Sequence, residues 1–279
     1  MLQIRRMTVK DVPFGMHLKE QAGWNQTEAD WRRLLAMEPD GCFLAEMGSE
    51  PAGTLTTCVF GSVAWIAMVL VEEARRGQGI ATALLKHAIA WLDARGVPTI
   101  RLDATPLGRP VYTKLGFVDE YEVTRYGGTP APVPELGPVR AYTPDHLEEV
   151  TRLDRRIAGT DRGKLLRRLL AGYPETARVV AVRGNVSGYC ALRPGTRATQ
   201  IGPCLASSPN AGQRLLADAV TRCAGEEVMV DVPNANEAAT TFMRGTGLAV
   251  QRSFVRMSRG VPPVDEVSGI WASSGPEKG

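Results

Sequence analysis

The chain has 279 residues, a net charge of +3, and ordinary hydrophobic and charged fractions of 44% and 23%. This length is sufficient for two domains that each bury a core. The small, dispersed charge excludes a basic stripe for nucleic acid, and no signal peptide or run of about 18 apolar residues is present. We therefore expect a cytoplasmic, soluble protein, monomer or homodimer, that binds neither nucleic acid nor membrane.

Cysteine and histidine are too few and too scattered for a metal site. The five cysteines are odd in number and show no C-x-x-C spacing, and there are only three histidines. Such a set predicts neither a disulfide framework nor a zinc site. We expect no metal.

The first 126 residues predict alternating strands and helices. A strand at 4–7 precedes a helix opened by Thr8 and Asp11, and a second helix begins at Thr27. Later elements are predicted as strands at 41–47, 52–60 and 63–71, a helix at 80–95, a strand at 99–105, a short helix near 112, and a strand at 115–125.

Residues 68–82 form the most informative stretch, M-V-L-V-E-E-A-R-R-G-Q-G-I-A-T. An apolar strand breaks into a turn with Gly77 and Gly79 and then begins a helix. Glycine lets the backbone approach a ligand closely, and the first N–H groups of a helix have no intrahelical partner. Together with the helix dipole and the adjacent Arg75 and Arg76, they suit a pyrophosphate.

Two other phosphate-binding loop motifs do not match these residues. A Walker A loop requires a lysine after Gly79, and G-x-G-x-x-G requires glycine where Thr82 stands. The stretch instead reads R-x-x-G-x-A, and Y-x-x-L-G-F follows at residues 112–117. Here the sequence resembles the GNAT superfamily of acyl-CoA-dependent N-acetyltransferases, in its two-domain bacterial form.

The resemblance extends to a second half. A Pro- and Gly-rich segment at 127–138 reads as a linker, and residues 139–147 then echo residues 4–12. We expect domains at 1–126 and 139–279, with an α/β fold of tandem GNAT units. Each unit is a twisted, mostly antiparallel central sheet flanked by helices.

The second half lacks the pyrophosphate cradle. Residues 206–212 read A-S-S-P-N-A-G, with no arginine and with a proline that removes an N–H donor. We expect a degenerate copy that binds acyl-CoA poorly or not at all. Gly212 reads as a packing residue, Asp231 and Asn236 as capping or substrate-contacting residues, and 269–272 as a final strand.

The resemblance implies a site for acetyl-CoA in the first half. The pantetheine arm would lie along the strand before the cradle, with the Val69 N–H as oxyanion donor and Tyr112 as general acid. Tyr112 could alternatively be a core residue. The implied cofactor-binding residues are Met68, Val69, Val71, Arg76, Gly77, Gln78, Gly79, Ile80, Ala81, Thr82, Thr105 and Tyr112.

The general base and the acceptor site are less defined. The strand before the cradle carries no glutamate, so Asp103 or Asp30 could serve as base through water, and Glu72 reads as a solvated turn residue. Substrate specificity in the family comes from the segment between the first strand and the second helix. The expected acceptor-binding residues there are Trp24, Asn25, Gln26 and Trp31, although both tryptophans could instead cover the sheet.

We therefore predict an N-acetyltransferase that moves acetyl from acetyl-CoA to a primary amine of a small metabolite in a ternary complex. One alternative is a non-catalytic acyl-CoA-binding sensor, favoured by the missing glutamate and opposed by Tyr112. Another is transfer to a protein amino terminus or lysine.

Overall fold

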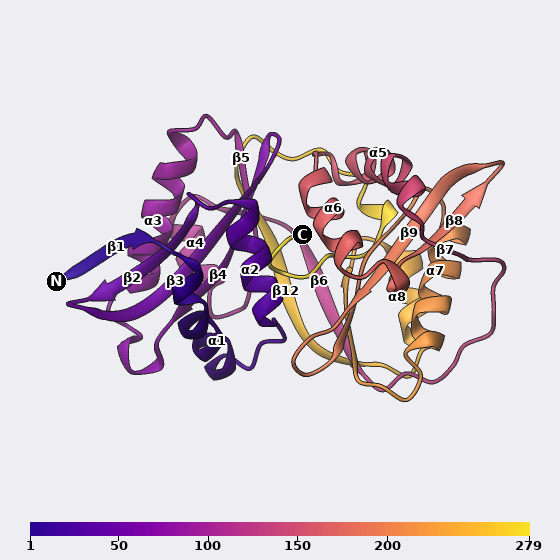
Figure 1. The fold of residues 1–279 in the computed structure, drawn as a ribbon, viewed down its shortest axis with the longest axis horizontal. Helices are drawn as coiled ribbons and strands as arrows, with labels where there is room; N and C mark the ends of the chain where they lie inside the picture. The colour runs from indigo at the N-terminus through magenta and orange to yellow at the C-terminus, as the bar shows by residue number, and fades with distance from the viewer.

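The computed structural model describes residues 1–279 and shows one 13-stranded sheet with helices on both faces (Figure 1). The first half contains β1 (Leu2–Arg6), α1 (Val12–Gln21), α2 (Glu28–Met37), β2 (Cys42–Met47), β3 (Glu50–Phe60), β4 (Val63–Val71), α3 (Ile80–Asp93), β5 (Thr99–Ala104), α4 (Arg109–Lys114) and β6 (Val118–Gly128). This order confirms the predicted mixed α/β fold.

The second half repeats the same order of elements. It contains β7 (Arg140–Ala141), α5 (Leu147–Ala158), α6 (Gly163–Gly172), β8 (Arg178–Val182), β9 (Asn185–Arg193), β10 (Thr199–Ala206), α7 (Pro209–Arg222), β11 (Val228–Pro233), α8 (Glu237–Arg244), β12 (Ala249–Gly260) and β13 (Ile270–Ala272). The predicted final strand is β13. None of the helices combines the length and apolarity needed to cross a bilayer.

The two halves share the sheet by exchanging strands. The strand order is β1-β2-β3-β4-β5-β12-β6-β11-β10-β9-β8-β7, with β13 against β10. Strand β12 of the second half pairs with β5 of the first, and β6 of the first half pairs with β11 of the second. Sequence analysis did not predict this exchange. The boundaries at 126 and 139 stay a prediction, but they do not separate two sheets.

Each exchanged strand carries a buried arginine that pairs with an aspartate of the other half. Arg256 on β12 binds both carboxylate oxygens of Asp103 on β5, at 2.8 and 2.9 Å. Arg125 on β6 binds Asp231 on β11 in the same bidentate way, at 2.7 and 2.8 Å. The exchange is therefore held by two equivalent ion pairs as well as by main-chain hydrogen bonds.

An Arg256→Leu variant is expected to lose about 3–5 kcal/mol of unfolding free energy, because it leaves the Asp103 carboxylate buried without its partner. Arg259→Leu is a matched control on the same strand, since Arg259 pairs with Asp93 at the surface. That change should cost about 1 kcal/mol or less. Urea unfolding measures both; equal losses would contradict a special role for the buried pair.

Alternate residues of β4 face different helices. Ala64 and Ile66 pack with Ile80 and Leu84 on the α3 side. Trp65 and Ala67 pack with α1 and α2 on the opposite side. This alternation follows from the two-residue period of a strand. The α1 and α2 layer also contacts the second half, because Leu165 of α6 belongs to the same apolar cluster.

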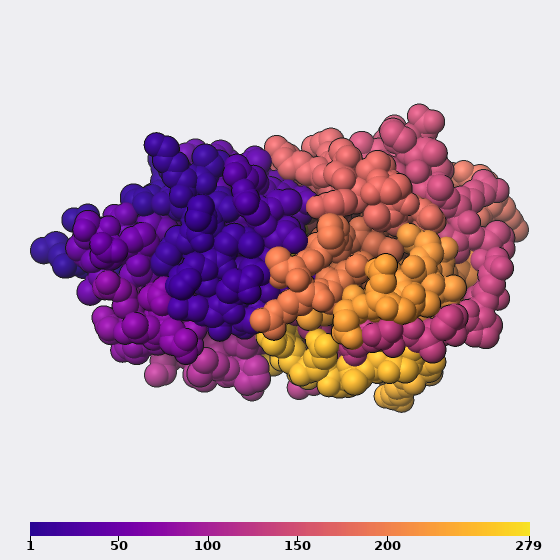
Figure 2. Space-filling model, turned by 60° about the horizontal axis from the view of Figure 1, so that its bottom comes forward, coloured from indigo at the N-terminus to yellow at the C-terminus, as the bar shows by residue number.

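Polar contacts join the two halves along their boundary, which is called the seam below. The halves lie in broad contact in the space-filling view (Figure 2). The Lys164 ammonium lies 2.9 Å from a Glu38 carboxylate oxygen, and the Thr160 hydroxyl donates to the Phe60 carbonyl. The second half therefore contacts the first half at the end of α2 and at the end of β3.

Candidate active site

The cradle has the backbone that its sequence predicts. Gly77 and Gly79 both have φ of +78°, in the left-handed region that glycine adopts without strain. No protein atom lies within 4 Å of a Cβ built on either glycine, so the loop faces open space. The loop can therefore admit a ligand directly against its main chain.

Helix α3 begins at this loop without a side-chain cap. Gly79 is its N-cap residue, and the first helical bond runs from the Ala83 N–H to the Gly79 carbonyl, at 3.0 Å. The N–H groups of Ile80, Ala81 and Thr82 precede that bond and have no partner in the helix. Arg76 lies at the rim with its side chain 48% exposed, next to Glu73. This combination of free N–H groups and a nearby guanidinium suits a pyrophosphate.

Strand β4 leaves its neighbour just before the cradle. It pairs with β5 only from Val63 to Trp65, after which the two parallel strands diverge. The edge of β4 toward β5 is thus unpaired between residues 66 and 71. Backbone groups on such an open edge can pair with an extended ligand.

The same stretch of β4 has a β-bulge in its pairing with β3. Met68 and Val69 both oppose the single residue Leu55 of β3, and Met68 has a positive φ of +51°. The Thr54 hydroxyl donates to the Met68 carbonyl at 2.9 Å, which holds the bulge in place. Bulges re-aim the backbone, and a non-glycine residue in this conformation is strained. The strained residue directly precedes Val69, whose N–H is the predicted oxyanion donor.

Helix α4 brings Tyr112 to the same side of the sheet. Val69, Val71 and Tyr112 all border the apolar cluster under α3. Tyr112 makes an edge-on contact with Phe117, with ring centroids 6.0 Å apart. Burial raises the pKa of Tyr112 to about 12, with no contribution from a protein hydrogen bond. The phenol therefore keeps its proton at neutral pH and is free to donate it.

Thr105 shapes the turn that leads to α4. Its hydroxyl accepts a hydrogen bond from the Gly108 N–H at 3.2 Å, and its carbonyl accepts from the N–H groups of Gly108 and Arg109. Gly108 lies against the ring of Tyr112, where an added Cβ would be 2.9 Å from Cε2. Thr105 thus positions Tyr112; contact with a ligand stays a prediction.

The two aspartates predicted as bases are both held in ion pairs. Asp103 is bound on both oxygens by Arg256, and Arg256 also donates to the Tyr121 hydroxyl at 2.9 Å. Asp30 caps α2 through Thr27. Burial alone would raise the pKa of the Asp30 carboxyl, but the charges of Arg193 and Lys278 lower this pKa below its usual range. We therefore assign both carboxylates structural roles in place of the predicted catalytic one.

The residues predicted to bind the acceptor are mostly buried against the second half or in the core. The Asn25 amide binds the backbone of Arg197 and Ala198, and the Gln26 amide donates to Glu277 at 3.0 Å. Trp31 is fully buried under α1, and Trp24 packs partly against the same cluster. Asn25, Gln26 and Trp31 are thus corrected to packing and interface residues, and only Trp24 keeps a partly exposed face.

Sequence analysis missed a polar group at the end of β4. Glu72 accepts hydrogen bonds from His17 at 3.0 Å and from Gln21 at 2.5 Å, both on α1. The Gln21 hydrogen bond is the main cause that lowers the pKa of Glu72. The i, i+4 spacing of His17 and Gln21 was the available signal, since such residues share one helix face. Glu72 is thus an ordered hydrogen-bond acceptor beside the cradle and not a solvated turn residue.

Two family models match the chain. The model described as the acetyltransferase (GNAT) family matches residues 12–117, and that described as an acetyltransferase (GNAT) domain matches residues 150–270. The first range contains the cradle and Tyr112, and the second contains β10 and α7.

Similar proteins align with both halves. A holothin acyltransferase of Pseudoalteromonas sp. strain SANK 73390 is 26% identical over 92% of this chain and 87% of its own length. The uncharacterized N-acetyltransferase YitH of Bacillus subtilis strain 168 is 24% identical over 78% of each. The crystal structure of a proposed acetyltransferase from Pyrococcus horikoshii superposes with a TM-score of 0.86, at 26% identity, over 100% of this chain and 96% of its own.

A tandem GNAT protein from the clavulanic acid biosynthesis pathway shares the fold alone. Its TM-score is 0.66 at 16% identity, over 95% of this chain and 100% of its own. The two-unit architecture is therefore found in solved structures of low sequence similarity.

Proposed function

We propose, from the premise that this chain is a GNAT acyltransferase with two GNAT domains, that its first half acetylates a primary amine of a small metabolite, with acetyl-CoA as donor. The observation that carries this proposal is the open edge of β4 with its bulge at Met68, directly before the uncapped start of α3. A backbone site for an extended arm is thus continuous with one for its pyrophosphate.

Donor binding, stabilisation of the oxyanion and protonation of the leaving group each have a candidate group in the first half. The N–H groups at the start of α3 would hold the pyrophosphate, and acetyl-CoA supplies the activated acetyl group. In a ternary complex, the amine nitrogen forms a bond to the acetyl carbon as the carbon–sulfur bond breaks. The Val69 N–H would stabilise the negative charge that develops on the acetyl oxygen, and the Tyr112 hydroxyl would donate its proton to the departing thiolate.

The amine must lose one proton overall. Asp103 and Asp30 are held by arginines, so they are poor acceptors for that proton. Glu72, which accepts a hydrogen bond from His17, lies at the end of β4 shortly before the cradle. An amine that is already neutral near pH 7 needs no base before it attacks, and the one proton that it loses as the amide forms passes to water or restores the Tyr112 hydroxyl. We therefore expect weakly basic amines to be better acceptors than alkylamines, whose reference pKa is about 10.4.

The test is release of free thiol from acetyl-CoA in the presence of a panel of primary amines. The panel should span amine pKa values from about 5 to 10, with each rate measured at several pH values. We expect amine-dependent thiol release that follows the neutral fraction of each amine. Thiol release that no amine accelerates would contradict transfer to a small amine.

A non-catalytic acyl-CoA sensor is the second candidate. The ion pair with Arg256 occupies Asp103, so β5 offers no free carboxylate that could act as a base. The sensor hypothesis predicts binding of acetyl-CoA without turnover for every amine, and no effect of Tyr112→Phe on any measured property.

A further inference from the structure

The second half contains the same divergence of parallel strands as the first. Strand β10 pairs with β11 only from Thr199 to Ile201, just as β4 pairs with β5 over three residues. In the second half, however, β13 fills the gap. Cys204 pairs with Ala272 and Leu205 with Ile270, and the Ser273 N–H donates to the Asp231 carbonyl of β11 at 2.8 Å. One edge is open, and its counterpart is occupied by the chain itself.

Glycines in the second half make room for this strand. Trp271 is fully buried against Gly212 of α7, where a Cβ would lie 2.0 Å from the indole ring. Gly202 of β10, with φ of +137°, lies against the Ser273 carbonyl, where a Cβ would be 2.1 Å away. Both glycines therefore permit a contact that any side chain would block.

The helix that follows β10 is also closed. The Ser208 hydroxyl accepts from the Ala211 N–H, and Pro209 occupies the first turn, where it offers no N–H. Helix α3 of the first half has neither feature. The positions of both the arm and the pyrophosphate are thus blocked by protein groups in the second half.

Beyond β13 the chain continues into the seam between the halves. The Trp65 indole donates to the Pro276 carbonyl at 2.9 Å, and Gln26 donates to Glu277. The Arg162 guanidinium donates to the Gly279 carbonyl at 2.6 Å. A cavity of about 20 Å³, room for a single water, remains beside Trp65 and Lys278. Residues 273–279 therefore fill the space under α2.

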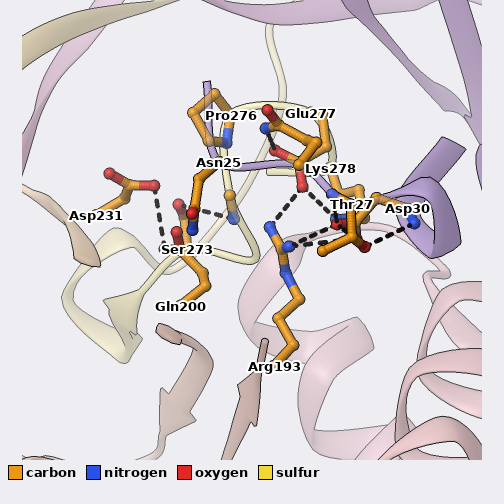
Figure 3. A network of polar contacts seen from close by, with 12 residues as sticks. Asn25, Thr27, Asp30, Arg193, Gln200, Asp231, Ser273, Pro276, Glu277 and Lys278 are labelled. Atoms are coloured by element: carbon orange, nitrogen blue, oxygen red, sulfur yellow. Dashed lines mark hydrogen bonds and ion pairs between the residues drawn. The ribbon is translucent and has the colours of Figure 1, made fainter. Parts of the chain in front are cut away.

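Buried charges hold this segment to the first turn of α2. Arg193 of β9 binds Glu277 at 2.6 Å and Asp30 at 3.1 Å, and the Lys278 ammonium lies 3.6 Å from Asp30 (Figure 3). Each of these four side chains is at most 3% exposed. With so little water, loss of one charge leaves its partners unpaired. The tail is thus coupled to the capped start of α2.

We propose that residues 270–273 act as an internal occupant of the second half, where they exclude acyl-CoA, and that residues 274–279 position the segment from Trp24 to Asp30 for the acceptor of the first half. The second statement rests on the proposed function. The chain then binds one acyl-CoA, and the degenerate half contributes to the reaction by holding the acceptor side of the first.

Stoichiometry tests the first statement. Titration calorimetry with acetyl-CoA should give one site per chain, and Gly79→Asp should remove all binding. Ser208→Ala, which uncaps the second-half helix, should leave both affinity and stoichiometry unchanged. Two sites per chain, or a site that persists in Gly79→Asp, would overturn the internal-occupant assignment. Absence of any binding by the wild type would instead contradict the proposed function.

Acceptor kinetics test the second statement. Glu277→Gln should raise the KM for the amine by about 10-fold or more through misplacement of the acceptor segment. The affinity for acetyl-CoA should stay within about two-fold, because the cradle is untouched. The surface variant Glu175→Gln serves as control. An unchanged KM in Glu277→Gln, or a parallel loss of acetyl-CoA affinity, would contradict the positioning role.

If a thermal melt shows that Glu277→Gln does not fold, a second variant tests the same proposal. Gln26→Leu removes the hydrogen bond to Glu277 from the first-half side and introduces no unpaired charge into the network. It should raise the same KM in the same direction, and an unchanged KM there would equally contradict the proposal.

Discussion

A Gly79→Asp variant is expected to lose acetyl-CoA binding by at least about 100-fold and to lose activity with it. The Cβ itself has room, since no protein atom lies within 4 Å of it. Aspartate also tolerates a positive φ better than most residues, so the fold should survive. The new carboxylate, however, would stand at the N-terminus of α3, where the phosphate charge is expected, and like charges repel. Titration calorimetry measures the loss.

Gly79→Asn is the matched control for this prediction. It has nearly the same size and the same tolerance of φ near +78°, but no charge. We expect a much smaller loss of affinity than for aspartate, and near-equal thermal melts for both variants. If aspartate and asparagine weaken binding equally, then backbone strain and not phosphate charge explains the effect. If neither weakens it, the cradle does not hold the ligand.

Tyr112→Phe is expected to lower kcat by about 100-fold or more, the usual range for loss of a general acid, with the affinity for acetyl-CoA unchanged. Phenylalanine keeps the edge-on contact with Phe117 and the packing against Gly108. A purely structural tyrosine would therefore tolerate the change. The same substitution at Tyr142, which follows β7 and packs in an apolar cluster with α5 and α6, is the control and should leave kcat unaltered.

The pH dependence gives an independent measure of Tyr112. Because burial raises its pKa to about 12, the proton-donating form persists below that pH. We expect kcat of the wild type to show no fall from loss of this proton between about pH 7 and 10, where an unshifted tyrosine would begin to ionise. A falling limb near pH 10 that is absent in Tyr112→Phe would contradict the raised pKa.

Local rules were enough to predict the elements and the cradle. Residues 63–82 form a strand, a turn with two left-handed glycines and a helix start, and each feature depends on neighbours in the chain. The second half was correctly read as having no cradle, because Pro209 and Ser208 close its helix by contacts within four residues. Gly212 was also read correctly as a packing residue.

The acceptor side was misread because its contacts come from far along the chain. Asn25 and Gln26 look like exposed amides in sequence, but residues 197–198 and Glu277 satisfy them. Asp103 looks like a free carboxylate at a strand end, but Arg256 binds it. A polar side chain can take part in catalysis only if no residue from elsewhere in the chain already binds it. A local sequence pattern does not indicate whether such a residue exists.

The sequence by itself determined which segments are strands and helices and that a turn with two left-handed glycines precedes α3, because propensity, periodicity and helix-start chemistry act over a few residues. Only the tertiary structure decided that β12 pairs with β5 and that β6 pairs with β11. The main-chain hydrogen bonds of a sheet are alike for every strand, so the local sequence does not select which sheet edge a strand joins. The tertiary structure also decided that β13 enters the second half and not the first. There Gly212 and Gly202 leave space for Trp271 and Ser273, a complementarity that exists only once the chain is folded.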